Sequence, residues 1–341
     1  MKKICILVIA LFLSAAAMVS AQMMLQPVAS VNLIKPEMIS RDQLDDKIAE
    51  MQAASPGQTI DEKRVLEIMV NDVLVLQGAE RAGITISDQD LNKLILNQKK
   101  NIENQLGQLL TEEEFALVLK QAYGLSLEDL KDTYRQSYVV NTYIRSAKGD
   151  MIENVPAPTE AEITAFYKKN AASFINPEYV NISHIYLSKE NGTTAKPKEK
   201  AETILRTLSF GTKTFDELVI AHSQDDASKF VGGNIGWFAI DDASSRMSFG
   251  DAFMDAVFEL DAGDISGVLE SKTGYHIVRV NEHTYTRLLT LNDQLAPDNT
   301  MTVRQYISQS LYVEKQQDAY QLAVSALVKD LREEAEVTIL L

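Results

Sequence analysis

The sequence is poor in cysteine, glycine, proline and positive charge. Its 341 residues include one Cys, 15 Gly and 8 Pro, and 33 Lys and Arg stand against 48 Asp and Glu, which gives a net charge of −15. The scarcity of glycine and proline, without a short repeat or a low-complexity tract, excludes collagen-like, disordered and solenoid chains. The acidic balance excludes binding that depends on neutralising phosphates, so we expect no nucleic-acid partner.

The chain also lacks an apolar run long enough to be a good membrane span. The longest run covers residues 4–17, which is shorter than the roughly 20 residues that a spanning helix needs. Lys2 and Lys3 precede this run, and small residues lead up to a cut after Ala21. We therefore predict a cleavable signal peptide over residues 1–21, a periplasmic destination and no stable membrane span after cleavage. A retained anchor is the alternative.

The single cysteine lies inside this amino-terminal run, at Cys5, and not directly after the predicted cut, which argues against lipid attachment. Cleavage would leave no thiol, and the loss of Lys2 and Lys3 would take the net charge to −17. A chain without thiols suits an oxidising compartment. It also excludes disulfides, thiolate metal sites and cysteine nucleophiles.

What the sequence does contain is helix signals on both sides of a central segment. Four Ser or Thr residues, each with an acid three residues later, predict helix starts at Ser87, Thr111, Ser126 and Thr159. A strand-like stretch at 28–33 precedes these helices, and a helix over 302–334 with a strand at 337–341 closes the chain. Because the closing helix has an apolar stripe, we expect it to pack on the amino-terminal helices.

The periodicity changes after Pro177. Alternating apolar residues predict strands at 179–187, 235–239, 265–270 and 275–280, and helical patterns fill much of the intervals between them. The helices are expected at 195–208, 215–222 and 252–258. The order strand, helix, helix, strand, helix, strand, strand indicates one α+β domain.

Few side chains in this middle segment could carry chemistry. His184 and His276 lie inside predicted strands, and Asp225 and Asp226 follow a helix. The ordinary interpretation is two core imidazoles with satisfied nitrogens and a turn carboxylate. If the first and last strands are neighbours, however, the two imidazoles could bond to each other and to an acid. Two histidines without further ligands do not make a metal site, so we expect no metal.

Two common motifs are missing from the same segment. Ser223 is not part of a Gly-x-Ser-x-Gly elbow, which argues against a hydrolase. The glycines at 232–236 lack the G-x-G-x-x-G spacing and precede a strand, so they do not form a dinucleotide-binding loop. We therefore expect no cofactor.

Six linked motifs resemble the parvulin family of peptidyl-prolyl isomerases in order and spacing. They are Asn181-Ile-Ser-His-Ile-Tyr-Leu, Phe215-Asp-Glu-Leu with His222-Ser-Gln-Asp, Gly232-Gly-Asn-Ile-Gly-Trp-Phe, Phe253-Met-Asp-Ala-Val-Phe, Gly263-Asp-Ile-Ser and Thr273-Gly-Tyr-His-Ile-Val. The flanks, at about 27–175 and 300–341, are similar to extracytoplasmic foldases of the SurA and PrsA type. One parvulin unit is present here, where SurA has two.

The resemblance implies a multidomain chain of α and α+β units. We expect a signal peptide at 1–21, a helical chaperone-like domain at 22–175, a parvulin domain at 177–284 with a four-stranded antiparallel sheet, and a segment at 285–341 that packs on the amino-terminal domain. It also implies a site. His184, His276, Asp225 and Thr273 match the family's catalytic positions, and Ile235 and Phe253, with Phe249 or Met247, match the apolar cup around the proline ring.

The implied function is a periplasmic prolyl isomerase and folding chaperone. Its partners would be unfolded or nascent exported polypeptides, including outer-membrane proteins, that contain X-Pro bonds. The alternative is a holdase whose parvulin domain binds peptide without catalysis. A purely structural protein is a third interpretation, and it would make the middle motifs scaffold alone.

Overall fold

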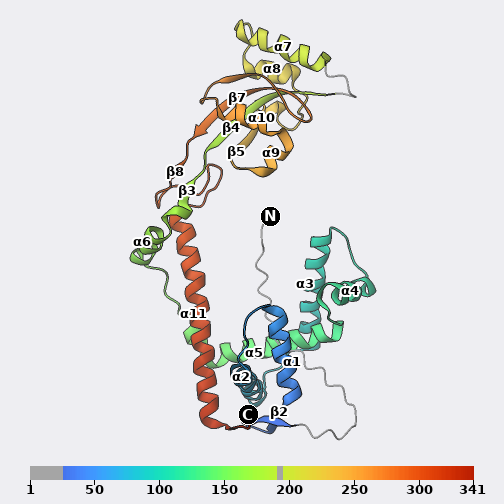
Figure 1. The fold of residues 1–341 in the computed structure, drawn as a ribbon, viewed down its shortest axis with the longest axis vertical. Coiled ribbons are helices and arrows are strands. Elements are labelled where there is room, and N and C mark those ends of the chain that lie inside the picture. Colours follow the sequence, from blue (N-terminus) through green and yellow to red (C-terminus); the bar gives the residue numbers. More distant parts are fainter. Residues whose placement is uncertain (1–25, 190–194) are drawn as a thin grey trace. The chain divides into compact units, whose positions relative to one another are not determined.

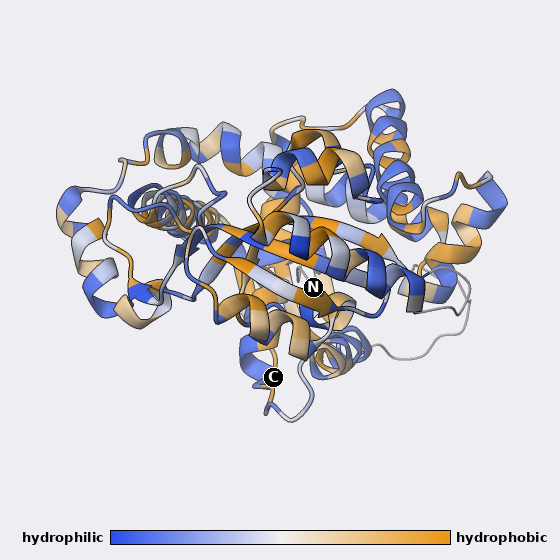
Figure 2. Cartoon of the chain, turned by 90° about the horizontal axis from the view of Figure 1, so that it is seen from above, coloured by the Kyte–Doolittle hydropathy of each residue, from blue (hydrophilic) through white to orange (hydrophobic). Residues whose placement is uncertain are grey.

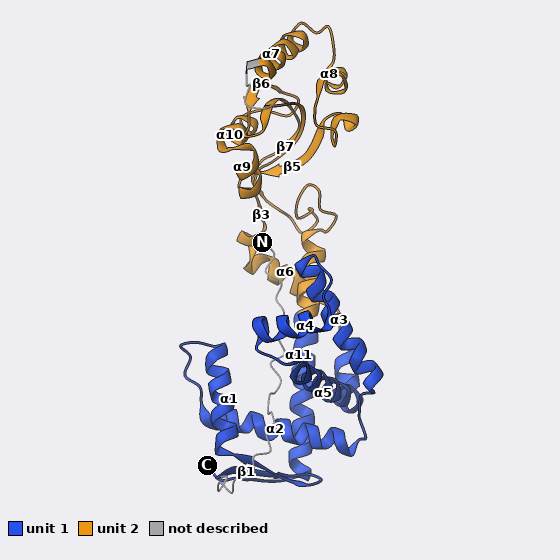
Figure 3. Cartoon of the chain, turned by 90° about the vertical axis from the view of Figure 1, so that its right-hand side faces the viewer, with its two compact units in different colours: residues 1–156, 314–341 blue, residues 157–313 orange. Residues whose placement is uncertain are grey.

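The computed structural model describes residues 26–189 and 195–341. The chain divides into two compact units, one made of residues 1–156 and 314–341 and the other of residues 157–313 (Figure 3). The predicted signal peptide lies outside the described residues. Among the described residues, no helix is both long and apolar enough to cross a membrane.

The first unit begins and ends in one small antiparallel sheet. Strand β1 (Pro27–Asn32) lies between β2 (Pro36–Ser40) and β9 (Glu336–Ile339). The first and last strands of the chain are therefore hydrogen-bonded to each other, in a register that pairs Val31 with Val337. The predicted strands at 28–33 and 337–341 are confirmed, whereas β2 was not predicted.

Helices make up the rest of the first unit (Figure 1). They are α1 (Arg41–Ala54), α2 (Glu62–Arg81), α3 (Asp88–Leu106), α4 (Glu112–Val118) with the π-turn η1 (Leu119–Tyr123), α5 (Leu127–Glu153) and the last part of α11 (Val303–Glu334). The helix starts predicted at Ser87, Thr111 and Ser126 are confirmed, because each side chain accepts the backbone N–H three residues on. That bond satisfies one of the free donors of a first turn.

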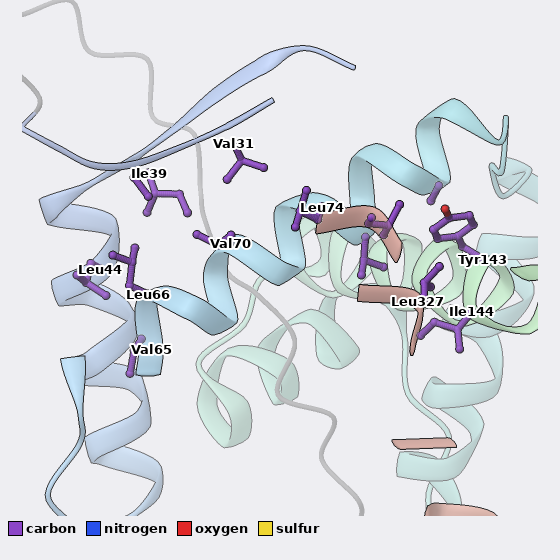
Figure 4. Packing of buried hydrophobic residues seen from close by; sticks show 14 of the residues in the cluster. Val31, Ile39, Leu44, Val65, Leu66, Val70, Leu74, Tyr143, Ile144 and Leu327 are labelled. Atoms are coloured by element: carbon purple, nitrogen blue, oxygen red, sulfur yellow. The ribbon is translucent and has the colours of Figure 1, made fainter. Parts of the chain in front are cut away.

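The core of this unit joins both ends of the chain. Val31, Leu66, Leu74 and Tyr143 are buried in the same cluster as Leu327 of α11 (Figure 4). Helices α2 and α5 come close at Gly78, where an added Cβ would lie 2.7 Å from the Tyr143 ring. The closing helix and strand therefore pack on the amino-terminal elements, as their apolar stripe predicts.

The second unit contains a four-stranded antiparallel sheet in the order β5-β4-β7-β6. The strands are β4 (Tyr179–Ser188), β5 (Asn234–Ala239), β6 (Ile265–Glu270) and β7 (Gly274–Thr284). The α+β fold expected for this segment is confirmed. The first and last strands, β4 and β7, are neighbours at its centre, which is the arrangement that would bring His184 and His276 together.

Helices pack against both faces of this sheet, and apolar residues recur along its strands (Figure 2). One face packs against α7 (Ala195–Ser209) and α8 (Phe215–His222) through Ile185 and Ile277. The other packs against α10 (Asp251–Phe258) through Ile182 and Val278. The short helix α9 (Ala243–Phe249), which was not predicted, adds Phe249 to this second face.

The second unit extends beyond the predicted parvulin limits of 177–284. Helix α6 (Glu160–Lys169), whose predicted start at Thr159 is confirmed, packs with Phe174 and with Leu289, Val303 and Ile307 in one buried cluster. The 3-10 turn η2 (Ala171–Phe174) leads into a two-stranded pair of β3 (Ile175–Asn176) and β8 (Arg287–Leu288). Residues 157–175 and 285–313 bury one another's apolar side chains, and they lie in the same compact unit as the sheet.

Candidate active site

The centre of the four-stranded sheet brings the two strand histidines together. Tyr186 of β4 is the Cα partner of His276 on β7, which places His184 diagonally across from His276. Residues two apart on a strand share a face, so both imidazoles lie on the face that packs against α10. Their Nδ1 atoms are 3.1 Å apart, and the two residues are 5% and 2% exposed.

The two histidines are the middle of a longer hydrogen-bonded chain. His184 Nε2 lies 3.0 Å from Asp225 Oδ2, and His276 Nε2 lies 2.8 Å from the hydroxyl of Ser271. Asp225 also accepts a hydrogen bond from the buried hydroxyl of Ser228. Ser271 and Ser228 were not predicted, because each reaches the site only through the turn that it occupies.

The number of protons available fixes which atom donates and which accepts at each hydrogen bond of this chain. Asp225 accepts hydrogen bonds from Ser228 and from the Ala227 N–H, and as a carboxylate it also accepts the hydrogen bond that His184 Nε2–H donates. The Nδ1 atom of His184 is then an acceptor, and the proton between the rings belongs to His276 Nδ1. The remaining nitrogen of His276 accepts from Ser271, whose oxygen accepts the Gly274 N–H at 3.2 Å.

The electrostatics agree with two neutral imidazoles. Burial lowers the pKa of His184, although Asp225 opposes the shift, and burial with the nearby His184 lowers the pKa of His276 to about 3. Burial by itself raises the pKa of Asp225, but the bonds from Ser228 and His184 outweigh it and hold that pKa below its usual range. Near neutral pH the site therefore holds one carboxylate and two uncharged rings.

An aromatic group lies directly against the histidines. The ring centroids of Phe253 and His276 are 5.0 Å apart, edge to face, and Phe249 stacks on Phe253 at 5.0 Å. The Tyr186 ring also lies near His276, at 4.9 Å, and its hydroxyl donates to the Thr273 carbonyl. The two phenylalanines form an apolar wall beside a fixed set of hydrogen-bonding groups.

The remaining predicted residues have different environments. Ile235 is half-buried in the cluster that contains Phe253, so the structure places it with the apolar wall. Met247 is 71% exposed and lies outside that cluster; its backbone carbonyl accepts a bond from Lys272. Of the two alternatives, Phe249 is the residue whose ring lies against His276, with the ring centroids 5.9 Å apart. The Thr273 hydroxyl lies 3.3 Å from the Ser271 hydroxyl, so its hydrogen-bonded link to the imidazoles is indirect and passes by way of Ser271.

A glycine fixes the backbone of His184. The carbonyl of Gly233 accepts the His184 N–H at 2.8 Å, and Gly233 has a φ of 75°. A Cβ at this position would lie 2.5 Å from the His184 carbonyl oxygen. Only a residue without a side chain permits this close approach between the turn and β4.

The arrangement suits a reaction that makes and breaks no covalent bond. Ser223, the one candidate nucleophile discussed above, is 2% exposed, and its oxygen accepts the Tyr186 N–H. An apolar wall beside fixed, uncharged polar groups favours a state with less charge separation than the ground state. Rotation about a peptide C–N bond passes through such a state, because the twisted amide loses its resonance.

Comparison with known proteins agrees with this geometry. Residues 165–284 match the family described as the PPIC-type PPIASE domain. The chain is 25% identical over 284 residues to chaperone SurA of Saccharophagus degradans, an alignment that covers 80% of this chain and 61% of that one. It is also 25% identical over 262 residues to foldase protein PrsA of Clostridium botulinum, which covers 76% and 68% of the two chains.

A solved structure of a SurA-like chaperone from Campylobacter jejuni covers 92% of this chain and all of that one, at 16% identity and a TM-score of 0.42. The chain spans about three fifths of the length of the SurA relative. The family match covers the whole four-stranded sheet, both histidines and Asp225. Residues 165–284 are thus a PPIC-type domain of the parvulin family of peptidyl-prolyl isomerases, in a chain with relatives named SurA and PrsA.

Proposed function

We propose that the protein catalyses cis–trans isomerisation of X-Pro bonds in unfolded exported polypeptides. The observation that carries this proposal is the directed chain from Asp225 through His184 and His276 to Ser271, set against Phe249 and Phe253. The proline ring packs against the phenylalanines, and the hydrogen-bonded groups hold the peptide while its C–N bond turns. The barrier to be lowered is about 18–20 kcal/mol, and each 1.4 kcal/mol removed gives a tenfold rate increase.

In this mechanism Asp225 is a positioning residue. It fixes the tautomer of His184, and His184 in turn fixes that of His276, so that the polar groups keep one arrangement during rotation. Thr273 contributes through Ser271, and Ile235 supports the apolar wall. Met247, exposed on α9, contacts the client chain beyond the proline. No metal and no cofactor takes part.

A second activity, the holding of unfolded chains, is proposed for the first unit. Several of its exposed apolar side chains fall in the short stretch from α3 to η1; they are Leu96, Leu106, Leu109, Leu117 and Tyr123. Leu109 is 87% exposed. Exposed apolar side chains offer contact area to an unfolded polypeptide without any chemistry.

The proposed location is the periplasm. The apolar run at 4–17 after two lysines supports export, and the absence of cysteine beyond Cys5 suits an oxidising compartment. The clients are then exported chains that still await folding. Fractionation of the native host, with amino-terminal sequencing of the mature protein, tests both the compartment and a cut after Ala21.

One experiment separates catalysis from binding. Prolyl turnover in a protease-coupled assay and suppression of client aggregation are measured on the full chain, on Phe249→Leu and on the double variant Leu109→Ser with Leu117→Ser. We expect Phe249→Leu to lose turnover but keep the holding activity, and the leucine variant to do the reverse. A folded wild-type chain without prolyl turnover would leave the binding-only holdase as the function.

A further inference from the structure

Tyr186 of β4 lies against both imidazoles of the site. The centroid of its ring is 4.9 Å from that of His276, and it stacks on His184 at 5.9 Å with 20° between the ring planes. The half-buried Tyr186 also packs on the backbone of Gly274, where an added Cβ would lie 2.5 Å from its ring. These contacts leave the ring little room to move, so its hydroxyl has a defined direction.

The phenol hydroxyl holds the turn between β6 and β7. It donates to the Thr273 carbonyl at 3.1 Å, and the Lys189 N–H donates to the same carbonyl at 3.0 Å. That carbonyl belongs to the peptide unit that also contains the Gly274 N–H, which donates to the hydroxyl oxygen of Ser271 at 3.2 Å. Because a peptide unit is planar, a hydroxyl that holds its carbonyl also sets the direction of its N–H.

The donors along this path all point the same way. The Ser271 hydroxyl has one hydrogen, and His276 Nε2 at 2.8 Å is a closer acceptor than the Gly274 carbonyl at 3.3 Å. The hydrogen-bonded chain of the site therefore begins before Ser271, at the Tyr186 hydroxyl, and runs through both imidazoles to Asp225. Hydrogen bonds in such a chain polarise one another, so a donor at its start strengthens the bond from Ser271 to His276.

We propose that Tyr186 is a positioning residue of the prolyl site, whose hydroxyl holds the Thr273–Gly274 peptide unit so that Ser271 keeps its hydrogen bond to His276. This inference rests on the proposed isomerase activity and adds a residue to its machinery. The hydroxyl acts through Ser271 and needs no contact with the client chain. The ring has a separate role, because it covers the imidazoles and keeps water from competing for their hydrogen bonds.

The test uses the full chain and the variant Tyr186→Phe, which removes the hydroxyl and keeps the ring. We expect prolyl kcat to fall about three- to tenfold and KM to change less than about twofold, because the hydroxyl acts on the site and not on the bound client. Tyr167→Phe is the matched control, since it loses a phenol bond to a backbone carbonyl, that of Leu289, elsewhere in the same unit. It should keep the wild-type kcat and KM.

A second readout separates positioning from a purely structural role. In Tyr186→Phe the nitrogen NMR shift of His276 Nε2 should move toward that of an imidazole nitrogen without a hydrogen bond, whereas Tyr167→Phe should keep the wild-type shift. This measurement does not depend on turnover. A wild-type chain without turnover would therefore count against the proposed function, and an unchanged Nε2 shift in Tyr186→Phe would overturn the role of Tyr186.

A double-mutant cycle with Ser271→Ala shows whether Tyr186 acts through that serine. In the Ser271→Ala background the hydroxyl has nothing left to position, so Tyr186→Phe should lower turnover by less than about twofold more. A further loss as large as that in the wild-type background would mean that the hydroxyl contacts the client directly, which overturns the proposal. Equal kcat in the wild type and Tyr186→Phe would overturn it as well, and so would an equal loss in Tyr167→Phe.

Discussion

The imidazoles of His184 and His276 face each other through their Nδ1 atoms at 3.1 Å, so the two rings share a single proton there. A proton on both nitrogens would place two donors against each other. The carboxylate of Asp225 decides which ring donates at this contact, because it accepts a hydrogen bond from His184 Nε2–H and so leaves His184 Nδ1 as the acceptor. The state of His276 next to the aromatic wall therefore depends on a residue two hydrogen bonds away.

Replacing Asp225 with Ala should lower prolyl kcat/KM by about tenfold or more, because a charge-assisted hydrogen bond worth roughly 1.5–3 kcal/mol is lost. The fold should change little, since Asp225 lies in a partly exposed turn. The measurement is a protease-coupled assay on the full chain. Asp226→Ala is the matched control, because Asp226 is exposed and adjacent. Equal turnover in both variants would remove Asp225 from the site.

The serine at the other end of the chain should matter more than the neighbouring threonine. Ser271→Ala leaves His276 Nε2 without its donor, whereas Thr273→Ala removes only a hydroxyl 3.3 Å from Ser271. We expect a several-fold greater loss of turnover in Ser271→Ala. Nitrogen NMR shifts of the imidazole should also show a changed tautomer for His276 in that variant alone. A greater effect of Thr273→Ala would contradict the hydrogen-bonded chain as described.

The stability of the second unit should fall as the pH drops below about 6.5. Both imidazoles have lowered pKa values in the folded state, so below 6.5 the unfolded chain takes up protons that the folded chain does not. His276 should then cost about 1 kcal/mol between pH 7.5 and 5.5, and His184 should add a cost of the same sign. Urea unfolding followed by the fluorescence of Trp237, the single tryptophan of the chain, on strand β5, measures this.

The carboxylates shift stability in another pH range. The lowered pKa of Asp225 adds stability above its ordinary value near 4, and this stability is lost only below that pH. The change in the free energy of unfolding between pH 6.5 and 4.5 therefore reports on the histidines. His276→Gln should flatten the slope there, although the variant starts less stable. An unchanged slope would show that His276 is charged in the folded protein.

Parts of this architecture could be predicted because their causes are local. A Ser or Thr with an acid three residues on satisfies free N–H groups wherever it occurs, so the helix starts at Ser87, Thr111, Ser126 and Thr159 were predicted correctly. The strands of the central sheet were found because apolar alternation reflects burial of a face. The two-residue strands β3 and β8 have too few residues to show a period.

The residues of the site also fall into those that a local sequence signal predicts and those that it does not. His184, His276 and Asp225 stand out because titratable groups are unusual within or just after apolar elements. Ser271 carries no such signal, since it reaches His276 only because the turn from β6 to β7 folds its hydroxyl back. The sequence also gives no signal that residues 157–175 and 285–313 bury one another, because they are more than a hundred residues apart along the chain.

Two glycine substitutions test the backbone support of His184. Gly233→Ala and Gly236→Ala both place a side chain at positive φ, which costs about 1–2 kcal/mol. At Gly236 an added Cβ meets no described atom within 4 Å, whereas at Gly233 it lies 2.5 Å from the His184 carbonyl oxygen. Gly233→Ala should therefore be the less stable variant and should lose more prolyl turnover. Equal losses in the two would mean that only the backbone strain matters.

The last prediction concerns the closing helix. Leu327 on α11 is 4% exposed within the core of the first unit, and Leu322 on the same helix is 62% exposed. Leu327→Ala should destabilise the first unit by about 2–5 kcal/mol, because it leaves a cavity among residues from both ends of the chain. Leu322→Ala should stay within about 0.5 kcal/mol of wild type. Urea unfolding followed by far-ultraviolet circular dichroism gives both values. Since Leu327 packs in the same cluster as Val31, Leu327→Ala should also speed proteolysis at residues 27–40, and equal stability of the two variants would mean that α11 does not complete this core.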